Sequence, residues 1–149
     1  MSLLDRVRER LGGTPSESPP PPPDRGQWGE ARAAEWLHAH GFRILGRRVR
    51  VGDRDEFDLV AREGDALVFV EVKTRRSEAY GAPRDAVDRK KRHALSRAAV
   101  RYLRRLPSPN VNFRFDVVEV VGRIDGERPP IIRHIPNAFP LERRYDLPR

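Results

Sequence analysis

Two carboxylates and one amine near the middle of the chain have the types and spacing of a metal-dependent hydrolytic site. Asp58 is followed, after a polar break, by Glu71 and Lys73. Mg²⁺ takes only one or two protein carboxylates and keeps waters and phosphate oxygens in its other positions. A lysine two residues beyond the glutamate could orient or deprotonate one of those waters. The trio predicts phosphodiester hydrolysis, provided that the fold brings the three side chains together.

A β-hairpin is predicted to carry these residues. Two β-rich runs flank a Gly-Asp pair at residues 64–65, and such a pair often forms a two-residue turn. In that register Asp58 lies opposite Glu71, and Glu56 lies opposite Lys73. Because side chains alternate along a strand, all four project from one face. The apolar side chains of the other face form a predicted core surface: Phe57, Leu59, Ala61, Val68, Val70 and Val72.

Opposed carboxylates lie roughly 5 Å apart at Cβ and repel each other, so the predicted register needs compensation. A divalent cation is the simplest compensation. The alternative is an ordinary surface hairpin, in which Glu56 and Lys73 form a cross-strand ion pair. Of the 30 basic residues only Lys73, Lys90 and Lys91 are lysine, which favours a specific use of a titratable amine over the permanently charged guanidinium.

A helix is predicted before the hairpin, from an N-cap at Asp24 to Gly41. At 100° per residue Glu30 lies on the stripe of Ala33, Ala34 and Leu37, which suits packing on a sheet. A carboxylate on such a stripe needs a partner, and a metal site or a lysine is a candidate. The alternative is that Glu30 is simply an acidic residue favoured near a helix start.

Basic residues beyond the hairpin are candidates for nucleic-acid contacts. A second helix, at residues 88–106, places Lys91 at the edge of its apolar face and places Lys90, Arg97 and Arg101 on a basic stripe. Such a stripe suits phosphate contacts, although a solvated helix face explains many charge runs. The polar segment at residues 74–83 supplies Arg75, Arg76 and Tyr80, a combination that suits backbone contacts and base stacking or, alternatively, a mobile loop.

Three further strands complete the predicted element order. Residues 43–51 precede the hairpin, and residues 113–121 and 131–135 follow the second helix. The order of one helix, three strands, one helix and two strands indicates an α/β fold with a mixed central β-sheet flanked by helices.

Several ordered motifs resemble the bacterial YraN-like family, which is assigned to the PD-(D/E)XK nuclease superfamily and is similar to archaeal Holliday-junction resolvases. The resemblance covers about residues 26–139. It rests on Gly29-Glu30, residues 55–60 (DEFDLV), residues 69–75 (FVEVKTR), residues 81–83 (GAP), Lys91, residues 114–117 (RFDV) and residues 135–139 (IPNAF).

The resemblance implies a restriction-endonuclease-like core and a role for each matching residue. It makes Glu30 the helix carboxylate, Asp58 and Glu71 metal ligands together with the Val72 carbonyl, and Lys73 the catalytic lysine. It assigns supporting positions to Glu56 and Lys91, with Mg²⁺ or Mn²⁺ as the cofactor. The chain departs from the family pattern in having Asp55 where glycine is usual and Arg92 where glutamine is frequent.

Composition agrees with a small nucleic-acid enzyme. The 149 residues allow one domain, and a net charge of +8 favours polyanionic partners. No apolar run is long enough to span a membrane and no secretory leader is recognisable, so a cytoplasmic location is expected. We divide the chain into an extension at residues 1–25 and a nuclease-like domain at residues 26–149. The extension contains a short amphipathic segment, a candidate for protein docking through residues 1–12, and a polyproline spacer.

Three functions remain open at the level of sequence. The first is a metal-dependent nuclease acting on DNA, with branched or recombination-derived DNA among its candidate substrates. The second is a non-catalytic nucleic-acid-binding protein that retains the nuclease fold. The third is an interaction protein recruited through its amino-terminal segment. Junction resolvases act as two-fold dimers, so a homodimer is also open, although no dimer surface is recognisable.

Overall fold

The computed structural model describes residues 24–77, 87–107 and 111–145. In chain order these form α2 (Arg25–Ala39), β1 (Arg43–Val51), β2 (Asp55–Glu63), β3 (Ala66–Arg75), α3 (Arg89–Arg104), β4 (Phe113–Val121), β5 (Ile131–Phe139) and the short 3₁₀ helix η2 (Arg143–Tyr145). The predicted order of elements is confirmed. The last strand is longer than predicted, because its pairing with β4 extends to Phe139.

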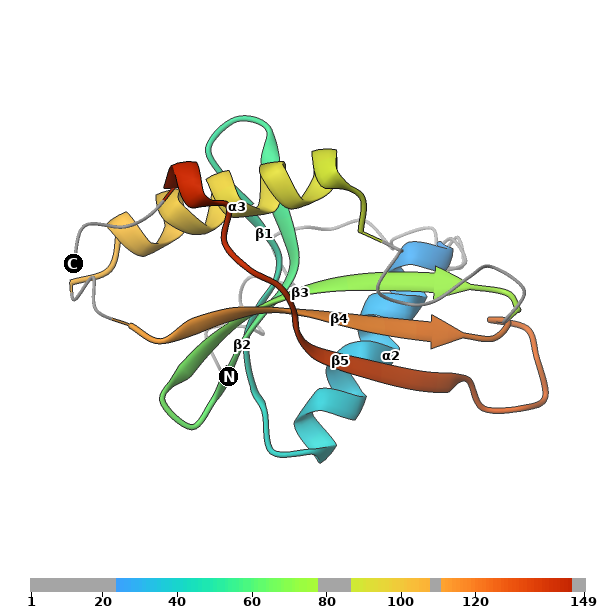
Figure 1. Cartoon of the computed structure of the whole chain (residues 1–149). Coiled ribbons are helices and arrows are strands. Elements are labelled where there is room, and N and C mark those ends of the chain that lie inside the picture. Colours follow the sequence, from blue (N-terminus) through green and yellow to red (C-terminus); the bar gives the residue numbers. More distant parts are fainter. Residues whose placement is uncertain (1–23, 78–86, 108–110, 146–149) are drawn as a thin grey trace, which may run out of the picture.

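The five strands form one mixed sheet in the order β1-β2-β3-β4-β5. All neighbouring strands are antiparallel except β3 and β4, which are parallel. A parallel pair needs a crossover connection, and α3 lies within it. Figure 1 shows α3 across one face of the sheet and α2 across the other. The α/β class with a mixed sheet between helices is therefore confirmed.

Both helices begin where the sequence predicts. Asp24 caps α2 by accepting the Gln27 N–H at 2.7 Å, and Asp88 caps α3 by accepting the Lys91 N–H at 2.8 Å. Each cap satisfies a backbone donor that has no partner within the helix. Beyond α2, Gly41 has a φ of +91°, a conformation that favours glycine.

Each helix covers its own hydrophobic cluster. The cluster under α3 includes Phe57, Phe69, Phe115, Leu95 and Leu103. The cluster under α2 contains one buried aromatic residue, Phe42, and otherwise smaller side chains: Ala33, Ala34, Leu37, Leu59, Ala61, Val68, Val70, Val118 and Val120. The three central strands β2, β3 and β4 are mostly buried on both faces, as is usual where a crossover helix covers a parallel pair.

The prediction that Phe57 shares a face with Leu59 and Ala61 is wrong. Phe57 stacks on Phe69 in the cluster under α3, with ring centroids 4.4 Å apart, whereas Leu59 belongs to the cluster under α2. The exchange occurs between Phe57 and Leu59, next to the point at which the β2–β3 ladder ends. Simple alternation cannot continue through this point.

The extension, including residues 1–12 and the proline run, lies outside the described residues, as does Tyr80. Helix α2 starts at Arg25, one residue before the predicted domain boundary. None of the helices in the described part of the chain is both long and apolar enough to cross a membrane.

Candidate active site

The candidate site lies where β2 separates from β3. The predicted register is confirmed from Glu63–Ala66 to Leu59–Val70, where the ladder between the two strands ends. Farther along, β2 pairs only with β1, from Phe57 to Asp55. Asp58 itself accepts a hydrogen bond from the Val72 N–H at Oδ2, 2.8 Å away. The predicted backbone pair of Asp58 and Glu71 is therefore replaced by a side-chain bridge between the strands.

Glu71 is the buried acid of the site. Its side chain is 5% exposed, and the amines of Lys73 and Lys91 lie 3.6 Å and 3.7 Å from its Oε1. Its other oxygen, Oε2, is buried and has no hydrogen-bond partner among the described residues. Burial and the neighbouring Asp58 charge raise the pKa of Glu71 to about 7, against the opposing influence of Lys91 and Lys73. Two acids and two amines are thus concentrated at one point, as predicted.

The donor set suits a divalent cation. Two adjacent carboxylates that repel each other and a buried oxygen without a partner are the groups that Mg²⁺ or Mn²⁺ would satisfy. Asp58 and Glu71 would hold the ion. The role of the Val72 carbonyl stays a prediction. No cluster of three or more His, Asp or Glu side chains able to hold a metal occurs within the described ranges, so water and substrate oxygens would have to complete the shell.

Glu30 does not contact this group directly. Its Oε2 accepts a hydrogen bond from Arg48 Nε at 2.9 Å, and its side chain is only 15% exposed. Its predicted inward position is correct, but the partner is an arginine that the sequence reasoning did not consider. Glu30 therefore holds Arg48, a β1 residue with a left-handed backbone conformation.

The amino-terminal end of α2 lies against the strand that carries the lysine. A Cβ added to Gly29 would lie 1.8 Å from Thr74 Oγ1, so only glycine permits this approach. Glu56 is exposed and pairs with Arg50 of β1 instead of facing Lys73 across the hairpin. The hydrogen bond and the charge of Glu30 raise the pKa of Arg48, and the charge of Glu56 makes a smaller contribution.

Asp55 is held by α3. Arg97 donates two hydrogen bonds to its carboxylate, at 2.9 Å and 2.7 Å, and these contacts lower the pKa of Asp55 despite its burial. The extra negative charge at this position is therefore compensated within the protein. The same contact directs Arg97 inward, with its side chain 19% exposed. The predicted place of Arg97 on an exposed basic stripe with Lys90 and Arg101 is therefore wrong.

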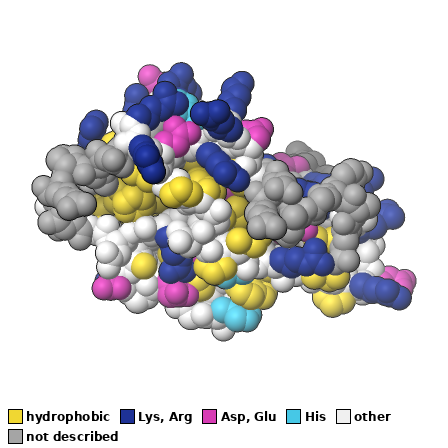
Figure 2. All heavy atoms as spheres, in the orientation of Figure 1, with side chains coloured by type: hydrophobic (Ala, Val, Ile, Leu, Met, Phe, Trp, Pro, Cys, Tyr) yellow, Lys and Arg dark blue, Asp and Glu magenta, His cyan; other side chains and the backbone are white. Residues whose placement is uncertain are grey.

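The other predicted nucleic-acid contacts have different surroundings. Lys90 and Arg101 are exposed on α3, and Arg76 is exposed just beyond β3. Figure 2 shows Lys and Arg side chains gathered over α3 and at the end of the sheet where β3 finishes. Arg75 is partly buried, with Nε 3.9 Å from Glu119 Oε2.

Glu119 is a buried residue of this face that the sequence analysis missed. It lies beside Lys73 in the parallel β3–β4 register, is 2% exposed, and has Arg133 Nη1 3.5 Å from Oε1. Its position was recognisable from the alternation of the strand, because Phe115, Val117 and Val121 share one face and Glu119 falls between Val117 and Val121.

The comparisons with known proteins give the chain a family. The model of "Uncharacterised protein family UPF0102" matches residues 29–120. The chain belongs to the UPF0102 family. A UPF0102 protein of Symbiobacterium thermophilum is 50% identical over 114 residues, which cover 76% of this chain and 94% of the relative. UPF0102 proteins of Trichlorobacter lovleyi and Geobacter sulfurreducens are 44% and 45% identical, covering 78% and 76% of this chain and 90% and 86% of the relatives. The YraN-like resemblance is confirmed at the level of family membership. The residues matched by the UPF0102 model include Glu30, Asp58, Glu71, Lys73 and Lys91.

Proposed function

We propose that this UPF0102 protein is a metal-dependent nuclease of the PD-(D/E)XK type, with a restriction-endonuclease-like core, that hydrolyses DNA phosphodiesters. The observation that carries the proposal is the position of Asp58 beside the buried Glu71, whose Oε2 has no hydrogen-bond partner among the described residues, together with two lysine amines. The net charge of +8 supports a polyanionic substrate.

The protein's own groups have separate parts in this reaction. Asp58 and Glu71 hold the cation, and the hydrogen bond from the Val72 N–H fixes the Asp58 carboxylate. Bound Mg²⁺ or Mn²⁺ would supply Lewis-acid activation of the phosphate and of water. Lys73 is partly exposed and adjacent to Glu71, so its amine can orient a water or take its proton. Lys91 brings a second positive charge from α3.

A non-catalytic nucleic-acid-binding protein is the second candidate. It is favoured by one observation: Glu30, the carboxylate that the family resemblance assigns to the site, is bound to Arg48. On this alternative the fold and the basic surface remain, but the two carboxylates do not support catalysis.

Cleavage of defined DNA substrates tests the proposal. Purified protein is incubated with linear duplex, single-stranded and four-way-junction DNA in Mg²⁺, Mn²⁺ or chelator. The variants Asp58→Asn, Glu71→Gln and Lys73→Gln preserve side-chain size. We expect metal-dependent cutting that falls by at least a hundredfold in each variant, the scale on which a positioned acid–base group contributes.

Asp65→Asn is the matched control, because Asp65 is an exposed carboxylate at the turn of the same hairpin. It should cut like the unmodified protein. Salt-sensitive DNA binding without cutting under any metal condition would refute the nuclease and support the second candidate. Cutting that survives in all three variants would place the activity elsewhere.

A further inference from the structure

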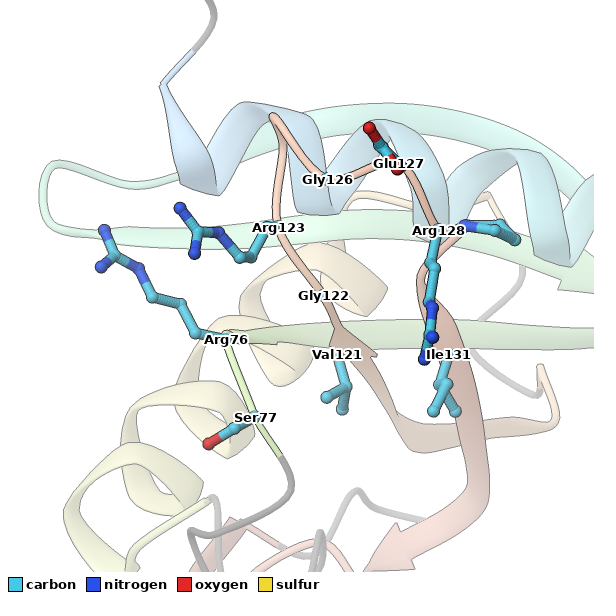
Figure 3. Close-up of a pocket in the computed structure, with 10 residues that line it drawn as sticks. Arg76, Ser77, Val121, Gly122, Arg123, Gly126, Glu127, Arg128 and Ile131 are labelled. Carbon is cyan, nitrogen blue, oxygen red and sulfur yellow. The ribbon is translucent and has the colours of Figure 1, made fainter.

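A hollow of about 560 Å³ lies at the far end of the sheet from α3, outside the candidate active site. Figure 3 shows its wall formed by the end of β3 and by the turn between β4 and β5. Its apolar side chains are Val121, Pro129 and Ile131, and its arginines are Arg76, Arg123 and Arg128. Ligand sites commonly combine an apolar surface with a few charged groups in this way.

The apolar floor is exposed to solvent. Ile131 pairs with Val121 across the β4–β5 ladder, and in Figure 3 the two side chains project in the same direction. Ile131 is 50% exposed, a large value for an isoleucine in a strand. An exposed apolar surface surrounded by charged residues is typical of a binding site.

The arginines around this floor have charge available for a ligand. Within the described part of the chain, neither Arg76 nor Arg128 forms an ion pair. Arg123 lies 3.2 Å from Asp125, but both side chains are about two-thirds exposed, so solvent screens that pair strongly. Glu127 also borders the hollow, yet its carboxylate points away from Val121 and Ile131 in Figure 3. The hollow therefore favours an anionic group.

The hollow and the candidate active site share one face of the sheet. Lys73 pairs with Glu119, and Arg75 pairs with Val121, in the parallel register. Side chains on the same face recur every second residue, so Glu71, Lys73, Glu119 and Val121 project together. Val121 follows Glu119, the partner of Lys73 in the ladder, by two residues, a distance of roughly 7 Å along a strand. A bound strand of DNA could reach both places.

We propose that this hollow binds one unpaired nucleotide of a DNA strand whose backbone passes the candidate active site. The base lies on Val121 and Ile131, and the arginines at 76 and 128 bind the adjacent phosphates. The inference rests on the proposed function for the identity of the substrate. In a duplex the base faces are covered by stacking, so this site selects single-stranded or branched DNA over continuous duplex.

Binding measured without cutting tests the inference. Full-length protein in chelator is titrated into a labelled 20-nucleotide single strand and into a blunt duplex of the same sequence. We expect Arg128→Gln and Ile131→Ser each to weaken single-strand binding by about tenfold and duplex binding by less than twofold. Arg43→Gln and Leu45→Ser are matched controls, since both residues are exposed on β1 and Leu45 is 47% exposed. They should leave both affinities within twofold.

Two results would overturn the inference: an unchanged single-strand affinity in Ile131→Ser, or equal losses for both DNA forms in Arg128→Gln. The first would show that no base uses the apolar floor, and the second that Arg128 acts only through general charge attraction. A cleavage assay on the same preparations separates this inference from the proposed function. Single-strand preference that depends on Ile131 without any cutting would retain the inference and refute the nuclease. Cutting, together with an unchanged single-strand affinity in Ile131→Ser, would support the nuclease and refute the inference.

Discussion

Glu71 is the residue whose protonation the site must control. An acid with its pKa raised to about 7 is largely protonated at acidic pH and gains a buried charge as the pH rises. The raised pKa means that this group stabilises the folded state most fully below its unfolded pKa, and that this contribution is lost as pH rises through 7. Ionisation of Glu71 in the folded state is expected to lower the free energy of unfolding by an amount on the order of 3 kcal/mol between acidic and basic pH.

Glu71→Gln should remove this pH dependence. Without metal, we expect the variant to have a melting temperature similar to that of the unmodified protein near pH 4.5 and roughly 5 °C higher or more at pH 8. Thermal unfolding of both proteins in chelator across this range provides the measurement. Equal melting temperatures at pH 8 would show that the charged form of Glu71 is not penalised.

A divalent cation should offset the loss of stability that ionisation of Glu71 causes at high pH. Adding MgCl₂ or MnCl₂ at pH 8 is expected to raise the melting temperature of the unmodified protein, because an ion that binds only the folded state stabilises it. Glu71→Gln and Asp58→Asn should lose most of that increase. An increase of the same size in both variants would locate the ion away from these carboxylates.

At the scale of elements, α3 is fastened to β2 by the Asp55–Arg97 pair. Both side chains are largely buried and joined by two hydrogen bonds. The same helix carries Lys91 to Glu71, so this contact helps to set the position of one active-site amine. On the opposite face, Gly29 brings α2 against Thr74, next to Lys73.

The effects of removing Asp55 and of removing Arg97 should not be additive, because the two side chains form one buried pair. Arg97→Ala leaves a buried carboxylate unpaired, and we expect it to lower the free energy of unfolding by about 3 kcal/mol. The Asp55→Ala/Arg97→Ala double variant should be less destabilised than the sum of the single variants. Urea denaturation of all four proteins measures this coupling. Strict additivity would mean that the pair contributes no interaction energy.

A second buried carboxylate holds β4 and β5 together. Asp116 accepts hydrogen bonds from Arg114 and from the Asn137 N–H, and its Oδ2 lies 2.7 Å from His134 Nε2. These contacts lie at the register shift between Phe115 and Val117. The family-like motifs at residues 114–117 and 135–139 thus have a structural role that is separate from the candidate site.

At the scale of the whole molecule, the positive charge extends well beyond the candidate site. Lys and Arg side chains gather over α3 and near the end of β3 in Figure 2, and the net charge is +8. Charge of this kind attracts the phosphate backbone of any nucleic acid and does not by itself select a sequence. Selection must come from sites of defined shape, such as the hollow beside Ile131.

DNA binding should therefore depend strongly on salt. We expect the affinity for a 20-base-pair duplex to fall at least tenfold between 50 and 200 mM KCl, because each neutralised phosphate releases counterions. Fluorescence anisotropy in chelator measures this dependence. Asp58→Asn should show the same slope, since Asp58 is not a phosphate contact. Affinity that does not change with salt would argue against backbone recognition.

The sequence by itself determined the elements and the local register. Helix caps at Asp24 and Asp88, the Gly64 turn and the alternation of apolar residues act over a few residues, so they can be recognised without the fold. The same local rules brought Asp58, Glu71 and Lys73 to one region.

Only the tertiary structure decided which side chains contact each other over long distances. Three such arrangements depend on how separate elements pack together: the pairing of Glu30 with Arg48, the inward turn of Arg97 to Asp55, and the placement of Phe57 and Leu59 in different clusters. Helical and strand periodicity says which face a residue occupies relative to its neighbours. It does not specify which charged group from another element will lie against that face, because that choice is made by packing of the whole domain.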